Sequence, residues 1–120
     1  MHGVDTRPAV GRLGEEVAAR LFEERGFAVV ERNYRCRAGE IDLVLRKGRL
    51  VVFCEVKART SAYWGEPSEA VGALKQQRLR RLAAMWLAAR RPGRVEIRFD
   101  VVSVVLSATG PDVTHIANAF

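Results

Sequence analysis

The chain has 120 residues, 48% of them hydrophobic, and a formal net charge of +6. This length suits one domain with its own core, and this apolar share excludes a disordered chain. Nearly all of the positive charge is arginine, which bonds phosphate better than lysine does. The charge therefore fits a nucleic-acid-binding protein, and equally a basic surface without a partner.

No apolar run approaches the roughly 20 residues that cross a bilayer, and the N-terminal segment MHGVDTRPAVG has no apolar stretch typical of a secretory signal. We therefore expect a single cytoplasmic domain over residues 1–120, without membrane contact and with Met1–Pro8 as a short mobile tail. Cys36 and Cys54 form neither a CxxC pair nor a zinc-binding spacing, which favours a reduced protein without structural metal.

Hydrophobic periodicity predicts a first helix over Pro8–Arg25, and Gly14 in the middle of its apolar face indicates close contact with a sheet. The elements predicted after it are strands Phe27–Tyr34, Glu40–Arg46 and Leu50–Arg59, a helix from about Pro67 to Arg90, and strands Val95–Leu106 and His115–Phe120. Lys47-Gly48 resembles a tight hairpin turn. The order αβββαβ(β) predicts an α/β fold, a mixed sheet flanked by helices.

The third predicted strand carries two charges on a face that should be buried. Side chains alternate along a strand, so Glu55 and Lys57 point the same way as Val51 and Phe53. Charges at the end of an apolar strand are costly to desolvate without partners. A metal ion or a neighbouring charge is the partner to look for.

The predicted hairpin supplies further carboxylates on that face. With Lys47-Gly48 as the turn, Asp42 lies diagonal to Glu55 and Glu40 lies directly opposite Glu55. Mg²⁺ prefers one or two carboxylates with waters and phosphate oxygens, and it can activate a water against a phosphodiester. A bare ExK usually forms a solvated ion pair, but an aspartate 13 residues upstream on the same face makes a metal site an equal alternative.

Asp followed by Glu-x-Lys on the next strand resembles the PD-(D/E)xK nuclease signature. The resemblance extends over GRLGEEVAARLFEERGF, RNYRCRAGEIDLVL, VVFCEVKART, YWGEPSEAV, RFDVVSV and a terminal NAF. These segments resemble the YraN family of uncharacterised bacterial proteins, which is similar to archaeal Holliday-junction resolvases. The resemblance implies a restriction-endonuclease-like fold, and it fixes a fold better than an activity.

The resemblance also implies roles for four residues. Asp42 and Glu55 match the metal-binding carboxylates, and Lys57 matches the catalytic lysine. Glu15 matches the first-helix glutamate that completes resolvase-type metal sites, although spacing alone favours a charge at a helix N-terminus. Ile41 stands where the superfamily name has proline, a departure that resolvase-like members tolerate.

Basic and aromatic residues near the third strand are candidates for nucleic-acid binding. Arg59, Tyr63 and Trp64 are suited to stacking on bases, although the two aromatics fit a loop folded against the core equally well. Arg78 belongs to an arginine run that either follows a phosphate backbone or forms a solvated helix face.

Lys75 falls inside the apolar stripe of the second helix, between Val71 and Leu79. We expect its ammonium to reach Glu55 or a phosphate held there, rather than to extend into water. On this sequence-based view, Lys75→Met keeps or raises thermal stability and weakens activity.

These patterns predict a Mg²⁺- or Mn²⁺-dependent endonuclease that hydrolyses DNA, branched DNA included. Two alternatives stay open: a module that binds nucleic acid without cutting it, and a basic domain that docks an acidic protein. Resolvases act as symmetric pairs, so by analogy we also expect a homodimer.

Overall fold

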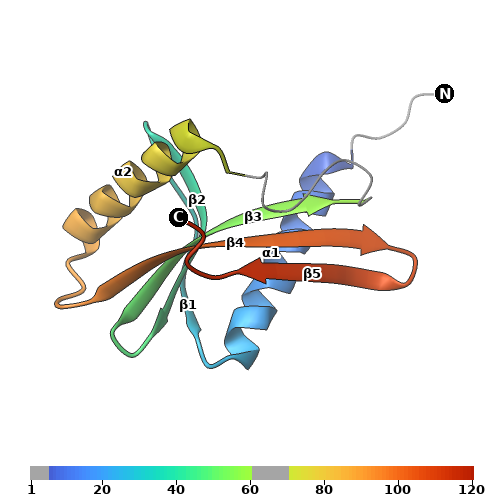
Figure 1. Cartoon of the computed structure of the whole chain (residues 1–120), viewed down its shortest axis with the longest axis horizontal. Coiled ribbons are helices and arrows are strands. Elements are labelled where there is room, and N and C mark those ends of the chain that lie inside the picture. The colour runs from blue at the N-terminus through green and yellow to red at the C-terminus, as the bar shows by residue number, and fades with distance from the viewer. Residues whose placement is uncertain (1–5, 61–70) are drawn as a thin grey trace.

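The computed structural model describes residues 6–60 and 71–120 and places one mixed sheet between two helices (Figure 1). The elements are α1 (Arg7–Glu24), β1 (Ala28–Cys36), β2 (Gly39–Lys47), β3 (Leu50–Arg59), α2 (Ala73–Arg90), β4 (Glu96–Ser107) and β5 (Gly110–Ile116). The strands lie in the order β1-β2-β3-β4-β5. Only β3 and β4 are parallel, and α2 lies in the crossover that a parallel pair requires. The predicted mixed α/β fold and its order of elements are confirmed.

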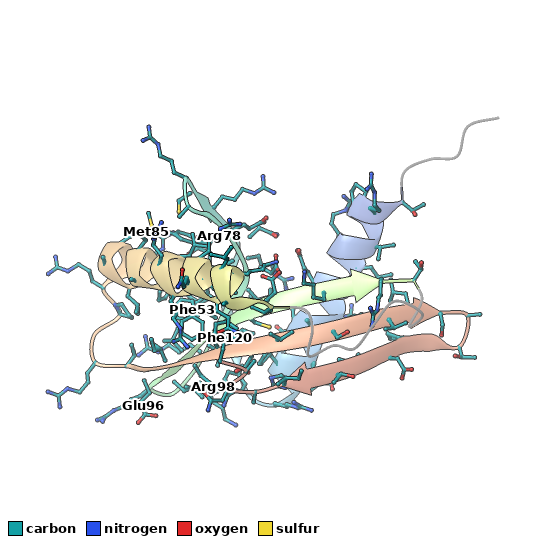
Figure 2. The ribbon with its side chains drawn as sticks, turned by 45° about the horizontal axis from the view of Figure 1, so that its top comes forward. Phe53, Arg78, Met85, Glu96, Arg98 and Phe120 are labelled. Carbon is teal, nitrogen blue, oxygen red and sulfur yellow. The ribbon has the colours of Figure 1, made fainter. Side chains whose placement is uncertain are left out.

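The two helices cover opposite faces of the sheet, and each face has its own core. Under α1 the buried residues are Ala18, Ala19, Phe22, Leu43, Leu45, Val52, Cys54, Val102 and Val104. Under α2 they are Ile41, Val44, Val51, Phe53, Leu79, Leu82, Ala83, Trp86 and Phe99. Figure 2 shows Phe53 and Phe120 beneath α2. Because β3 alternates between these two cores, the side of β3 that carries Glu55 and Lys57 is the α2 side.

Gly14 sets the distance between α1 and the sheet. A Cβ atom at this position would overlap the Cβ of Ala58 on β3. The absence of a side chain therefore lets the helix lie directly on the strand, as the sequence predicted, and it brings Glu15 close to the strands.

Three predicted boundaries need correction. The first helix begins at Arg7, so Arg7 and Pro8 do not belong to a tail. The second begins at Ala73 after an extended Gly72, because glycine is a poor helix former; residues 67–70 lie outside the described part of the chain. The last strand is Gly110–Ile116, since a turn after Ser107 pairs β5 with β4 and leaves Phe120 to stack on Phe99.

The register of the β2–β3 hairpin differs from the prediction by two residues. Lys47 pairs with Leu50, and Leu43 pairs with Cys54. Gly48 takes a positive φ of 59° in the turn. This slip of two residues changes which side chains are neighbours across the hairpin. The alternation of β2 is also interrupted, because Ile41 and Val44 lie in the core under α2 whereas Leu43 and Leu45 lie in the core under α1. Neither helix in the described residues is long and apolar enough to cross a bilayer.

Candidate functional site

Asp42 and Glu55 are brought side by side by this register. The last pair of this ladder is Leu43–Cys54, and Asp42 and Glu55 lie just beyond it, where both line one small cleft. The backbone N–H of Val56 donates to Asp42 Oδ2 over 2.7 Å and fixes the carboxylate at the strand edge. Glu55 is only 6% exposed. Two carboxylates therefore converge in a poorly solvated place.

Glu40 was predicted opposite Glu55, and this prediction is wrong. It pairs instead with Arg35 on β1, with Arg35 Nε 3.5 Å from Glu40 Oε1. Glu40 still lines the same small cleft as Asp42 and Glu55. This cleft of about 190 Å³ is lined by Gly39, Glu40, Asp42, Glu55, Lys75, Arg78 and Leu79.

Lys75 reaches Glu55 across the space between α2 and β3. Its Nζ lies 2.5 Å from Glu55 Oε1, which confirms the predicted direction of the side chain. The contact reverses the expected stability effect of Lys75→Met, because that substitution would leave a buried carboxylate without its cation. The half-buried lysine is thus a structural counter-ion in this state of the protein.

Lys57 lies one alternation beyond Glu55 on the same face of β3. Its pKa is lowered, first by burial and then by the positive charge of the neighbouring Lys75, while Glu55 acts in the opposite direction. A lysine with a lowered pKa releases its proton more readily than an exposed one. Such a group is suited to orienting a water or to contacting a phosphate.

Asp42 is the most strongly perturbed acid of the cleft. Burial and the negative charge of Glu55 raise its pKa to about 7, although the Val56 N–H bond acts against them. Two buried carboxylates repel one another unless a cation lies between them. A divalent ion bound between the two carboxylates would relieve this repulsion.

Glu15 approaches the cleft from α1. Burial raises its pKa, a hydrogen bond with Asn33 opposes this, and the charges of Glu40 and Glu55 add to the rise. Asn33 adopts a positive φ of 51° within β1, a conformation in which asparagine is enriched. The sequence patterns predicted Asn33 only as part of a strand. Its residue type was the one available signal for a positive φ.

A second, more open cleft adjoins the first at Glu40. It measures about 590 Å³ and is lined by Pro8, Gly11, Arg12, Glu15, Asn33, Arg35 and Glu40. Glu15, Glu40, Asp42 and Glu55 thus form an acidic row. Arg12 and Arg35 lie on one side of it, and Lys75 and Arg78 lie on the other. The two arginines of the larger cleft were missed from the sequence, because charge alone does not show which arginines lie near the site.

The donors fit a hard divalent cation. Within residues 6–60 and 71–120, no three His, Cys, Asp or Glu side chains are close enough to hold a metal ion by themselves. Mg²⁺ does not require three, since it commonly takes one or two carboxylates and completes its shell with waters and substrate phosphates. Asp42 and Glu55 are a pair of this kind, and the nearby charge of Glu15, the third predicted metal ligand, adds to the rise in the pKa of Asp42.

The predicted nucleic-acid contacts are placed only in part. Arg59 lies at the end of β3, two residues after Lys57, and is partly exposed. Arg78 is exposed on α2 and lies beside Gly39, at the edge of the small cleft (Figure 2). Tyr63 and Trp64 lie outside the described residues.

Asp100, another acid inside an apolar strand, lies outside this site. Arg98 donates to both of its carboxylate oxygens over 2.8 Å, and His115 Nε2 lies 2.7 Å from Oδ2. Burial opposes its ionisation, but the bonds from Arg98, His115 and Asn118 outweigh burial and lower its pKa. Asp100 is therefore a structural partner for Arg98 rather than part of the cleft.

Fold and cleft together define a mixed α/β protein with paired carboxylates and two lysines between α2 and the sheet. The profile of the Uncharacterised protein family UPF0102 matches residues 14–104, and the chain belongs to this family. It is 51% identical to a UPF0102 protein of Streptomyces griseus over 117 residues, covering 95% of this chain and 97% of that one. It is 44% identical to one of Geobacter metallireducens (93% and 92% covered) and 39% identical to one of Dictyoglomus thermophilum (92% and 96%).

Proposed function

We propose that the protein is a Mg²⁺- or Mn²⁺-dependent endonuclease that hydrolyses DNA phosphodiesters. The observation that carries the proposal is the pair of carboxylates, Asp42 and Glu55, that line one small cleft, with Lys57 on the same face of β3 as Glu55. When bound by these carboxylates, the ion would activate a water and stabilise the charge on the leaving oxygen.

The chain's own residues would divide the remaining work. Asp42 and Glu55 hold the cation, and the Val56 N–H keeps Asp42 oriented for it. Lys57 orients the attacking water or stabilises the negative charge that builds on the phosphate. Arg12 of the larger cleft and Arg78 of the smaller cleft bind phosphates flanking the scissile one.

A cleavage assay tests this proposal. Duplex, single-stranded, flapped and four-way DNA are incubated with the protein in Mg²⁺, Mn²⁺ or EDTA. We expect cleavage of at least one substrate with either metal and none in EDTA. An Asp42→Asn protein purified in parallel controls for contaminating nucleases. Binding to DNA without metal-dependent cleavage of any substrate would favour a non-cleaving module on the same fold.

Binding without chemistry gives a separate prediction. For each duplex phosphate that the protein neutralises, DNA affinity should fall by about 0.9 decade for each tenfold increase in salt concentration. Fluorescence anisotropy in EDTA measures this slope. Arg78→Gln should lower the slope by about 1, since it removes one phosphate contact.

Arg49→Gln is the matched control, because Arg49 is exposed in the β2–β3 turn at the far end of those strands. It removes the same charge and should leave the slope unchanged. A flat salt dependence, or no DNA binding at low salt, would favour a basic domain that docks an acidic protein.

A further inference from the structure

Lys75 pairs with Glu55, one of the two carboxylates that are proposed to bind the metal ion. Its Nζ lies 2.5 Å from Glu55 Oε1, and the side chain of Glu55 is only 8% exposed. Glu55, Asp42 and Lys75 line the same small cleft, so the ammonium group lies against one member of the carboxylate pair that is proposed to bind the cation. A cation that uses Glu55 must first compete with this lysine.

The surroundings make the lysine a movable group rather than a fixed one. Lys75 lies in the first turn of α2, and its side chain is 37% exposed. It neighbours Lys57, so two positive charges share one poorly solvated space. The pair with Glu55 offsets this repulsion only while Glu55 is free of another cation.

We propose that Lys75 is a tethered counter-ion that neutralises Glu55 in the metal-free protein and is exchanged for the divalent ion. On release, the ammonium swings from Glu55 towards the mouth of the cleft, where Arg78 lies, and contacts a substrate phosphate. The exchange rests on the proposed function. It goes further by making Lys75 a positioning residue that sets how tightly the site binds its metal.

The exchange has two consequences that a purely structural lysine would not have. Metal binding must break an ion pair, so its observed affinity is lower than the carboxylates alone would give. The released lysine also adds a phosphate contact, so metal and DNA favour one another's binding. In the absence of metal, Lys75 instead stabilises the fold by pairing with Glu55.

Calorimetric titration of Mn²⁺ tests the exchange without relying on activity. We expect Lys75→Met to bind Mn²⁺ about fivefold or more tightly than the wild type, because no ion pair has to be broken. Lys75→Arg keeps the counter-ion and should stay near wild-type affinity. Arg78→Met removes the same charge from the rim of the same cleft, so it measures the through-space effect of charge alone.

Thermal unfolding supplies a second readout. In EDTA, Lys75→Met should melt below the wild type, and Mn²⁺ should raise its melting temperature by more than it raises that of the wild type. Mn²⁺ binding that occurs only in Lys75→Met would be the strongest support for the exchange. Equal Mn²⁺ affinity in Lys75→Met and Arg78→Met would overturn it, even if Asp42→Asn still abolishes binding. Failure of the wild type and all of these variants to bind Mn²⁺ would instead remove the proposed function, and the exchange with it.

Discussion

Asp42→Asn and Glu55→Gln proteins are each expected to lose measurable Mn²⁺ binding and to cleave DNA at least about a thousandfold more slowly than the wild type, since a bound metal contributes several kcal/mol to the transition state. Each substitution removes one of the two carboxylate charges that line the small cleft. The loss of either carboxylate leaves the ion with one protein ligand and one negative charge fewer. Calorimetric titration measures the first effect, and single-turnover cleavage measures the second.

The fold should survive both substitutions. An asparagine at position 42 still offers an oxygen to the Val56 N–H, and a glutamine at position 55 still offers one to Lys75. Glu96→Gln, which neutralises an exposed acid at the start of β4, should bind Mn²⁺ as the wild type does. Mn²⁺ affinity that is the same in Asp42→Asn, Glu96→Gln and the wild type would refute the site.

The contribution of Asp42 to the stability of the metal-free protein should fall as pH rises from about 4 to about 7. Burial and the charge of Glu55 raise the pKa of Asp42 from 3.8 in an unperturbed carboxyl to about 7 in the folded protein. Between these values the folded state holds a proton that the unfolded state has released. The stability that this proton confers is present at acid pH and is lost as pH passes through the folded-state pKa. Above it, the buried pair of charges destabilises the fold.

Asp42→Asn removes this penalty. In EDTA at pH 8 it should be more stable to urea than the wild type, by at most about 4 kcal/mol. The difference should vanish near pH 4. Groups that do not interact with Asp42 affect both proteins alike, so the difference reports Asp42 together with the charges coupled to it. Asp112→Asn, at an exposed position of β5, controls for surface charge.

Bound Mn²⁺ should make the wild type more stable than Asp42→Asn, the reverse of the order expected in EDTA. Mn²⁺ at pH 8 should stabilise the wild type but not Asp42→Asn, and Mn²⁺ affinity should rise with pH up to about 7, because Asp42 must release its proton to bind the ion. A wild type whose metal-free stability does not fall relative to Asp42→Asn between pH 4 and pH 8 would show that Asp42 and Glu55 are not buried against one another.

Sequence patterns determined which faces the key side chains occupy. Alternation along β3 is local, so Val51 and Phe53 placed Glu55 and Lys57 on the buried side before any tertiary contact was known. Gly14 likewise indicated a close contact between the first helix and the sheet, since only a residue without a side chain permits so close an approach. The order of helices and strands followed from their periodicities in the same way.

The neighbours of those side chains were decided by tertiary structure. A two-residue slip of a hairpin preserves strand alternation, so sequence could not distinguish the register with Glu40 opposite Glu55 from the observed one, in which Leu43 pairs with Cys54. The observed turn at Gly48 made that choice. Asn33 contacts Glu15 only because its backbone adopts a positive φ opposite β2, which an apolar pattern does not report.

The ion pair between Lys75 and Glu55 shows the same division. Helical periodicity placed the lysine on the side of α2 that faces the sheet, and it even indicated Glu55 as a partner. The crossover from β3 to β4 sets where α2 begins and how it lies across the strands. A charge on a buried face needs a partner. Which side chain becomes that partner depends on how α2 is positioned over the strands, and the packing of the whole sheet sets this position. Here it brings Lys75 Nζ to 2.5 Å from Glu55 Oε1.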